Sequence, residues 1–178
     1  MNQLENAIGR LSILIEIVPK KLETRNEDEF ARQPWLGMWS KKQLLGQLID
    51  AAAMCHQRVV RIQYENEPIV VYNRKQWMDL QHYNSADSDD LIQLWKWYNK
   101  HLLHVFKHIP KENLEQTKAL RSGIEYSLES VVDDYISRLE KDVRNLFGSD
   151  FFGQEGKTFS KVRTIKRDLR ESFEPGIT

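Results

Sequence analysis

The sequence predicts an all-α protein, an up-and-down four-helix bundle with a C-terminal extension. Four long stretches repeat apolar side chains at helical spacing. The chain of 178 residues also contains only eight glycines and five prolines. A strand-rich fold of this size would need more of these turn-forming residues. Since this length suits one domain with a single core, we place the bundle at residues 1–148 and a charged extension at 149–178.

The first helix is expected over residues 2–23. Pro19 lies inside its apolar stripe and removes one backbone donor, so a kink or a break is expected there. Residues 24–38 follow as a polar connection, in which we expect Trp35, together with Trp39 just after it, to be packed. The stripe itself consists of Leu4, Ile8, Leu11, Ile15, Val18 and Leu22.

The second helix is expected over residues 40–64, with Ser40 as its N-cap. Two faces of this helix differ in character. The apolar seam consists of Leu45, Leu48, Ala52, Cys55, Val59 and Ile62. A second face, about a quarter-turn away, carries Gln47, Asp50, Met54, Arg58 and Arg61.

Residues 65–87 form a long connection that is rich in aromatic side chains, among them Trp77 and Tyr83. Such a loop is more often packed or functional than a free linker. Within it, residues 69–72 have the composition of a short strand that could lie across the end of the bundle.

The third helix is expected to begin after Ser88 and to end at Pro110, and the fourth to run over residues 127–147 with Gly148 as its C-cap. The core stripe of the third consists of Leu91, Leu94, Trp95, Tyr98, Leu102, Val105, Phe106 and Ile109. The core stripe of the fourth consists of Leu128, Val131, Val132, Tyr135, Leu139, Val143 and Leu146.

The charge balance and the N-terminus exclude several classes of protein. Lysine plus arginine and aspartate plus glutamate number 26 each, so neither nucleic acid nor an anionic membrane is an expected partner. The single cysteine, Cys55, cannot form an internal disulfide, and no leader or membrane-spanning pattern is seen. We therefore expect a soluble cytoplasmic protein.

Several short phrases over residues 39–147 stand in a characteristic order and spacing, and the most informative is at the start of the second helix. The phrases are Trp39-Ser40 with Leu45-Gly46-Gln47-Leu48 and Asp50, His56-Gln57-Arg58, the Trp77 to Tyr83 loop, Leu94-Trp95, Asn99, Ile109-Pro110 and Asp134-Tyr135. Together they make residues 39–147 resemble the DinB/YfiT-like family of four-helix bundles.

The resemblance implies a divalent metal bound by three histidines, one on the second helix and two on the fourth, with hydrolase or thiol-transferase chemistry in some members. Here the three matching positions hold Gln47, Arg138 and Asp142. An arginine cannot coordinate a cation, and a glutamine oxygen is a poor ligand for a transition metal. We therefore expect no cofactor at this site and lean away from an enzyme.

Two hypotheses follow for the altered site. Arg138 could replace the ion as a fixed positive charge, in a pocket for a small carboxylate or phosphate. Alternatively, Arg138 and Asp142 could form an ordinary i,i+4 ion pair. The pocket would be lined by Gln47, Asp50, Arg58, Trp77, Tyr83, Arg138 and Asp142.

Two further alternatives remain open. The chain could be an enzyme with a relocated metal site on the third helix, where His101, His104 and His108 share a face. The fold could also serve mainly as a scaffold for a homodimer, and we expect a homodimer as the quaternary state. Apolar residues of the extension could contribute to the dimer interface. Cys55 and His56 are expected to be a buried small hydrophobe and a hydrogen-bonded histidine rather than catalytic groups.

Overall fold

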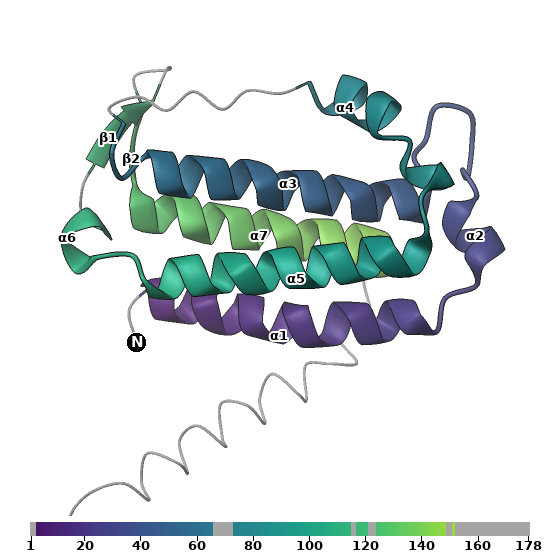
Figure 1. Ribbon diagram of the computed structural model, residues 1–178, viewed down its shortest axis with the longest axis horizontal. Coiled ribbons are helices and arrows are strands. Elements are labelled where there is room, and N and C mark those ends of the chain that lie inside the picture. The colour runs from purple at the N-terminus through teal and green to yellow at the C-terminus, as the bar shows by residue number, and fades with distance from the viewer. Residues whose placement is uncertain (1–2, 66–72, 115–116, 121–123, 149–150, 152–178) are drawn as a thin grey trace, which may run out of the picture. The chain divides into compact units, whose positions relative to one another are not determined.

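Four long helices make up the bundle in the computed structural model, which describes residues 3–65, 73–114, 117–120, 124–148 and 151 (Figure 1). They are α1 (Gln3–Glu23), α3 (Lys41–Arg61), α5 (Ser88–Lys107) and α7 (Leu128–Phe147). The predicted all-α four-helix bundle is confirmed. The shorter elements are α2 (Glu27–Ala31), α4 (Arg74–Gln81), the 3-10 helix η1 (Tyr83–Ser85), α6 (Lys111–Leu114), and the strands β1 (Thr117–Leu120) and β2 (Ile124–Ser127).

The chain divides into two compact units, residues 1–142 and residues 143–178. In the second unit, Gly148 ends α7 as the sequence indicated. Its φ is 99°, a conformation that glycine adopts without strain, and its N–H donates to the Arg144 carbonyl at 2.8 Å. Phe147 stacks on Phe151 with ring centroids 4.5 Å apart. The boundary at residue 148 stays a prediction, because most of the proposed extension lies outside the described residues.

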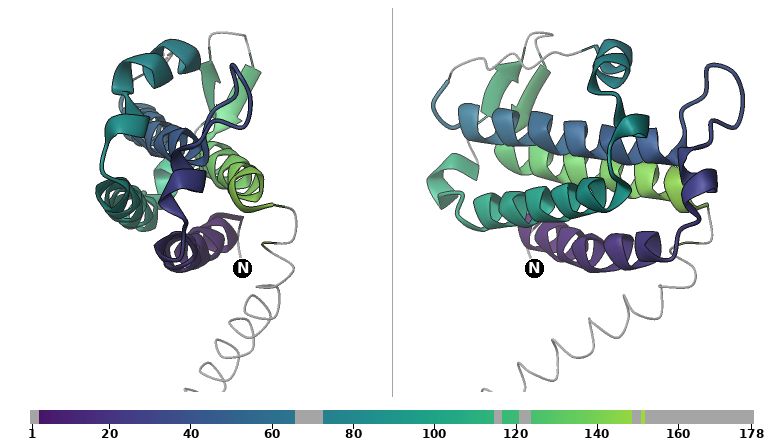
Figure 2. Two further views of the ribbon diagram at one scale, coloured as in Figure 1. Left: turned by 90° about the vertical axis from the view of Figure 1, so that its right-hand side faces the viewer. Right: turned by 45° about the vertical axis from the view of Figure 1, so that its right-hand side comes forward.

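The helices do not alternate in direction along the chain, so the predicted up-and-down order differs from the structure: α1 and α7 run one way, and α3 and α5 run the other (Figure 1). The Leu4 amide at the start of α1 donates to Glu129 at the start of α7, over 2.8 Å. In the view down the bundle, α1 and α3 lie at opposite corners (Figure 2). Helices α3 and α5 are parallel neighbours, and α4 and η1 lie near the end of the bundle at which both of them begin.

Local capping explains where the helices begin. The Ser40 hydroxyl accepts from the Gln43 amide at 3.1 Å, and the Gln43 side chain accepts from the Ser40 amide at 2.9 Å. This capping box confirms Ser40 as the N-cap of α3. Helix α5 begins one residue earlier than expected, because Asp87 rather than Ser88 caps it by accepting from the Asp90 amide at 3.0 Å.

The apolar seams of α3 and α7 are confirmed, since every residue predicted for them is buried. The stripe of α5 is partly wrong, because Leu94 is 48% exposed while Ile92 and Asn99 are buried in its place. Pro19 does not end α1, which continues to Glu23.

The connection between α1 and α3 differs from the expectation. It contains α2, capped by Asn26, whose side chain accepts from the Glu29 amide at 3.0 Å. Trp35 is 73% exposed rather than packed, because it belongs to a turn in which the Met38 amide donates to its carbonyl at 3.1 Å. The positive φ of Gly37, 83°, permits this turn.

The strand-like residues 69–72 lie outside the described residues. The strands that are described, β1 and β2, were missed by the sequence analysis. They pair antiparallel with Thr117 opposite Ser127 and Leu120 opposite Ile124.

None of the described helices combines the length and the hydropathy that crossing a bilayer requires.

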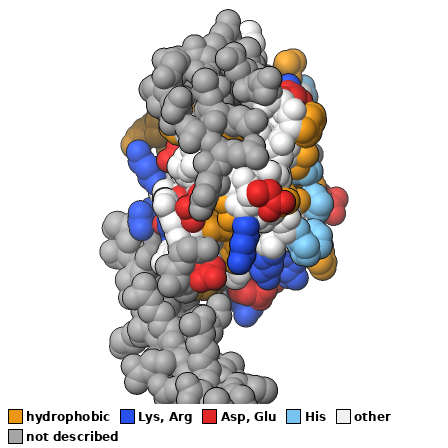
Figure 3. Space-filling view, turned by 90° about the vertical axis from the view of Figure 1, so that its left-hand side faces the viewer, with side chains coloured by type: hydrophobic (Ala, Val, Ile, Leu, Met, Phe, Trp, Pro, Cys, Tyr) orange, Lys and Arg blue, Asp and Glu red, His pale blue; other side chains and the backbone are white. Residues whose placement is uncertain are grey.

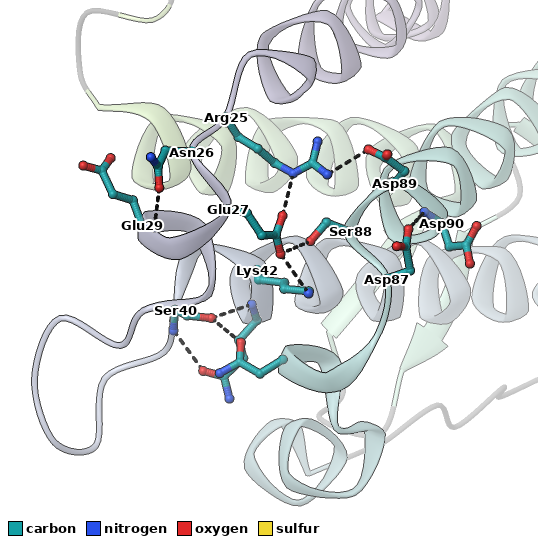
Figure 4. Close-up of polar contacts among 12 residues, drawn as sticks. Arg25, Asn26, Glu27, Glu29, Ser40, Lys42, Asp87, Ser88, Asp89 and Asp90 are labelled. Carbon is teal, nitrogen blue, oxygen red and sulfur yellow. Dashed lines mark hydrogen bonds and ion pairs between the residues drawn. The ribbon is translucent and has the colours of Figure 1, made fainter.

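Glu27 joins the ends of three long helices (Figure 4). Its carboxylate accepts from the Ser88 hydroxyl at 2.7 Å and pairs with Lys42 at 3.2 Å, while Arg25 contacts both Glu27 and Asp89. These hydrogen bonds lower the pKa of Glu27, with the Ser88 bond as the largest cause. They bring the first turns of α3 and α5 to the end of α1 and so fix one end of the bundle.

Candidate functional site: the corner of α3, α4 and η1

A buried tyrosine–carboxylate pair lies where the chain returns to α3. The Tyr83 hydroxyl donates to Asp50 Oδ1 over 2.5 Å, and the Gln81 amide nitrogen approaches the same oxygen at 3.3 Å. Asp50 is 3% exposed and Tyr83 6%. His82, with φ of 50°, ends α4 in the left-handed conformation and turns the chain so that Tyr83 points back to α3.

Gly46 makes room for the Tyr83 ring. A β-carbon at position 46 would overlap three atoms of that ring. Glycine in a helix interior is unfavourable by about 1 kcal/mol relative to alanine, so its presence needs a local reason. The close approach of Tyr83 supplies that reason, and a glycine in the middle of an otherwise regular helix was the signal in the sequence that we did not use.

Burial raises the pKa of Asp50, and the hydrogen bonds from Tyr83 and Gln81 oppose this rise. Because burial is the largest of these causes, the carboxyl group binds a proton more readily than an exposed aspartate does. The corner therefore holds a titratable group in hydrogen-bonded contact with a phenol.

Gln47, one residue after Gly46, is 5% exposed, and among the described residues its side-chain nitrogen has no hydrogen-bond acceptor. A buried donor without an acceptor is unfavourable by about 1–3 kcal/mol. This side chain is thus able to donate to an acceptor atom of a bound molecule.

Asp142 on α7 is half-buried, and burial raises the pKa of its carboxyl group. Arg74, Lys141 and Arg138 act against this rise through their charges, in that order. All three cations are exposed. The Asp142 carboxyl therefore lies in a positive surrounding formed by α7 and the first residue of α4.

Arg138 does not have the ion-pair partner that the sequence led us to expect. Its guanidinium donates to Asp134 at 3.3 Å, one turn earlier, and its side chain is 75% exposed. The ordinary i,i+4 pair thus exists but involves Asp134, not Asp142. Such an exposed pair contributes little to stability.

One of the proposed pocket residues, Arg58, lies apart from the corner. The Arg58 guanidinium lies 5.8 Å from the ring centre of Tyr126 in β2, and it is about three helical turns from Gln47 along α3. Trp77 is half-buried in α4. The structure thus joins Asp50 to Tyr83 directly and places Arg58 with the hairpin.

The described residues contain no group of three or more His, Cys, Asp or Glu side chains that could hold a metal ion. The three histidines of the alternative site have different neighbours. The rings of His104 and His108 have centroids 4.2 Å apart and are tilted by 36°, whereas His101 meets His56 of α3 at 4.9 Å. A metal site formed by His101, His104 and His108 stays a prediction.

The expected roles of Cys55 and His56 fit their surroundings. Cys55 is 7% exposed, and burial raises the pKa of its thiol far above the usual range, so the thiolate is disfavoured. His56 Nδ1 lies 3.2 Å from the Tyr98 hydroxyl. Asn99, quoted only as part of a family phrase, is fully buried and accepts from the Tyr135 hydroxyl at 2.6 Å.

Comparisons with known proteins show the fold. The chain is similar to YfiT from Bacillus subtilis, described as a probable metal-dependent hydrolase with an unusual four-helix bundle topology. The TM-score is 0.68 at 17% identity, over 86% of this chain and 87% of YfiT. It is also similar to the mycothiol-dependent maleylpyruvate isomerase, with a TM-score of 0.68 at 14% identity, over 84% of this chain and 63% of the isomerase. A histidine-to-alanine variant of that isomerase matches equally well.

No protein-family model matches the sequence, and no curated protein matches it. The similarity therefore lies in the arrangement of the helices. The resemblance drawn from the sequence is confirmed at the level of the fold: the chain has the four-helix bundle of the DinB/YfiT-like proteins.

Proposed function

We propose that this chain is a binding module on the DinB/YfiT-like fold, in which the family's metal position has become a site for a small anion such as a carboxylate or a phosphate. The observation that carries the proposal is the buried side-chain nitrogen of Gln47, for which the described part of the chain provides no hydrogen-bond acceptor. A ligand oxygen would satisfy this donor, and a small anion offers several such oxygens.

The donor set does not fit the metal that the fold implies. Of the three residues at the histidine positions, only Asp142 offers an oxygen of the kind that divalent ions prefer. Arg138 brings a permanent positive charge, and Arg74 and Lys141 add two more around the same carboxyl group. These charges oppose a cation and favour an anion, so we derive no catalytic step through a metal.

Binding of phosphate and of acetate to the full chain, measured by titration calorimetry, tests this proposal. We expect Gln47→Leu and Arg138→Gln to weaken binding at least tenfold, because each removes one donor or charge. Arg32→Gln serves as the control, since it removes an equally exposed arginine next to α2. Equal binding by all four proteins would contradict the proposal.

A second experiment asks whether the three positions correspond to a metal site at all. The triple variant Gln47→His, Arg138→His, Asp142→His should gain one zinc or nickel ion per chain, measured by elemental analysis, while the natural chain holds none at these positions. If the natural chain holds an ion that Asp142→Asn removes, then the enzyme hypothesis is favoured, and YfiT becomes the functional guide.

A homodimer belongs to the same proposal. Leu94 and Trp97 on α5 are 48% and 60% exposed, and apolar groups of this size on a helix face are typical of subunit contacts. Light scattering should give twice the chain mass, and Trp97→Glu should return the protein to the monomer mass. A chain ending at Gly148 should keep the dimer if the contact is made by α5 rather than by the extension.

A further inference from the structure

We infer that His56 and His101 form a two-histidine site for a borderline divalent cation such as Zn²⁺ between α3 and α5. This site is separate from the corner of α3, α4 and η1 and does not depend on the proposed function. It uses neither the family's histidine positions nor the stripe of three histidines on α5.

The two rings come from different helices and meet at 4.9 Å between centroids, at an interplanar angle of 82°. Imidazole nitrogens bind Zn²⁺ at about 2 Å, which brings the centres of two rings on one ion to about 5 Å from each other. His101 is exposed, so rotation of its ring can direct a nitrogen to the ion that His56 binds. The observed separation thus needs only a change of side-chain torsion.

Tyr98 orients the His56 ring through a hydrogen bond, as residues that contact a metal ligand from outside the coordination sphere do. The Tyr98 hydroxyl lies 3.2 Å from His56 Nδ1, and the two rings are edge to face, with centroids 5.9 Å apart. When Nδ1 donates its proton to the hydroxyl oxygen, Nε2 carries the lone pair that a metal requires. Histidine ligands in proteins usually have such a partner on the other ring nitrogen.

The surroundings favour the neutral, ligating form of His56. Partial burial and the neighbouring His101 lower the pKa of His56, in that order of effect. The adjacent Cys55 does not compete as a ligand, because its thiol is buried among apolar groups and its thiolate is disfavoured. Imidazole is the preferred ligand of copper, nickel and zinc, which indicates this class of cation rather than magnesium or calcium.

The described residues offer no third ligand to this pair, so water or an incoming molecule would complete the coordination. Histidine side chains gather along one edge of the face in Figure 3, beside hydrophobic side chains. Because His101 is exposed and His56 is half-buried, a metal held by these two residues would remain open to solvent on one side and would link α3 to α5.

Competition with a zinc-binding dye on metal-free full-length protein tests the site. We expect one Zn²⁺ per chain, with affinity at least tenfold lower in His56→Ala and in His101→Ala, and no further loss in the double variant. Tyr98→Phe should weaken binding about tenfold, as the loss of second-shell partners does elsewhere. His108→Ala is the matched control, because it lies about 10 Å from His101 along the helix and should bind as the natural chain does.

Nuclear magnetic resonance of the natural chain gives a readout that does not depend on how the variants fold. Adding Zn²⁺ should shift the imidazole signals of His56 and His101 together, at one equivalent, and leave those of His104 and His108 in place. Equal weakening by His108→Ala and His101→Ala would mean an adventitious ion only and would overturn the inference. So would the absence of any Zn²⁺ binding by the natural chain.

Discussion

The Tyr83 ring lies directly against Gly46, so closely that a β-carbon on residue 46 would overlap it. The contact joins η1 to α3 across a chain segment that contains α4. It also places the Tyr83 hydroxyl on Asp50, one turn further along α3. The position of Tyr83, and with it the candidate site, therefore depends on the absence of a single methyl group.

Gly46→Ala should destabilise the protein by about 1–3 kcal/mol, because the added methyl group forces Tyr83 and η1 away from α3. Urea unfolding measures the change. Gly9→Ala is the matched control, since a β-carbon there meets nothing within 4 Å and the substitution should raise stability by about 0.5–1 kcal/mol. Equal effects of the two substitutions would show that Tyr83 does not constrain residue 46.

Tyr83→Phe should raise the pKa of Asp50 further, because the tyrosine hydrogen bond stabilises the carboxylate against burial. Since the pKa is raised in the folded protein, the group favours folding below its ordinary value of 3.8 and loses that contribution as pH rises through the folded pKa. Carbon-detected titration of the Asp50 carboxyl group measures the shift.

The same variant should lower the free energy of unfolding at pH 7 by about 1–2 kcal/mol, as a buried acceptor loses its best donor. Asp50→Asn keeps an oxygen that can accept from Tyr83 and removes the charge. It should therefore lower the free energy of unfolding by less than Tyr83→Phe does. An unchanged pKa of Asp50 in Tyr83→Phe would argue that the hydrogen bond is weak in solution.

Arg10→Ala should destabilise the bundle by about 1–3 kcal/mol, because one guanidinium joins α1 to three residues of α7. It contacts Asp133 at 2.8 Å, Ser137 at 3.0 Å and both oxygens of Glu140 at 2.8 Å, and it is only 24% exposed. Arg10→Lys should recover only part of the loss, since an ammonium cannot form the two-pronged contact.

The control for Arg10 is Lys75→Ala, which removes a pair with Asp79 that is 80% and 56% exposed. That substitution should change stability by less than about 0.5 kcal/mol. A double-mutant cycle between Arg10 and Glu140 separates their interaction from the loss of packing, and a coupling energy near zero would contradict our interpretation.

Glu27→Gln should make the free energy of unfolding depend less steeply on pH in the acidic range. The pKa of Glu27 is lowered in the folded protein, so its contribution is present above its ordinary pKa of 4.5 and is lost as pH falls through the folded pKa. Unfolding measured from pH 6 to pH 3 should show a shallower decline in the variant. The effect is small because the Glu27 side chain is 52% exposed. Glu29→Gln is the matched control, because it changes a carboxylate on the same short helix and keeps the backbone amide that donates to Asn26.

The sequence alone was sufficient for the approximate spans of the four long helices and for the seams of α3 and α7. Ser40 capped α3 as predicted, Gly148 ended α7, and the seam residues of both helices are buried. These features depend on neighbours within a few positions, so a periodic pattern and a capping residue contain the necessary information.

Only the tertiary structure decided how the helices associate and which side chains meet. The parallel arrangement of α3 and α5, the exposure of Leu94, and the contact of Tyr83 with Gly46 and Asp50 bring together residues far apart in the chain. Arg138 had two carboxylates within one turn, Asp134 and Asp142, and helical spacing treats them alike. Such outcomes depend on which surfaces are buried together, a property of the whole fold that no local pattern contains.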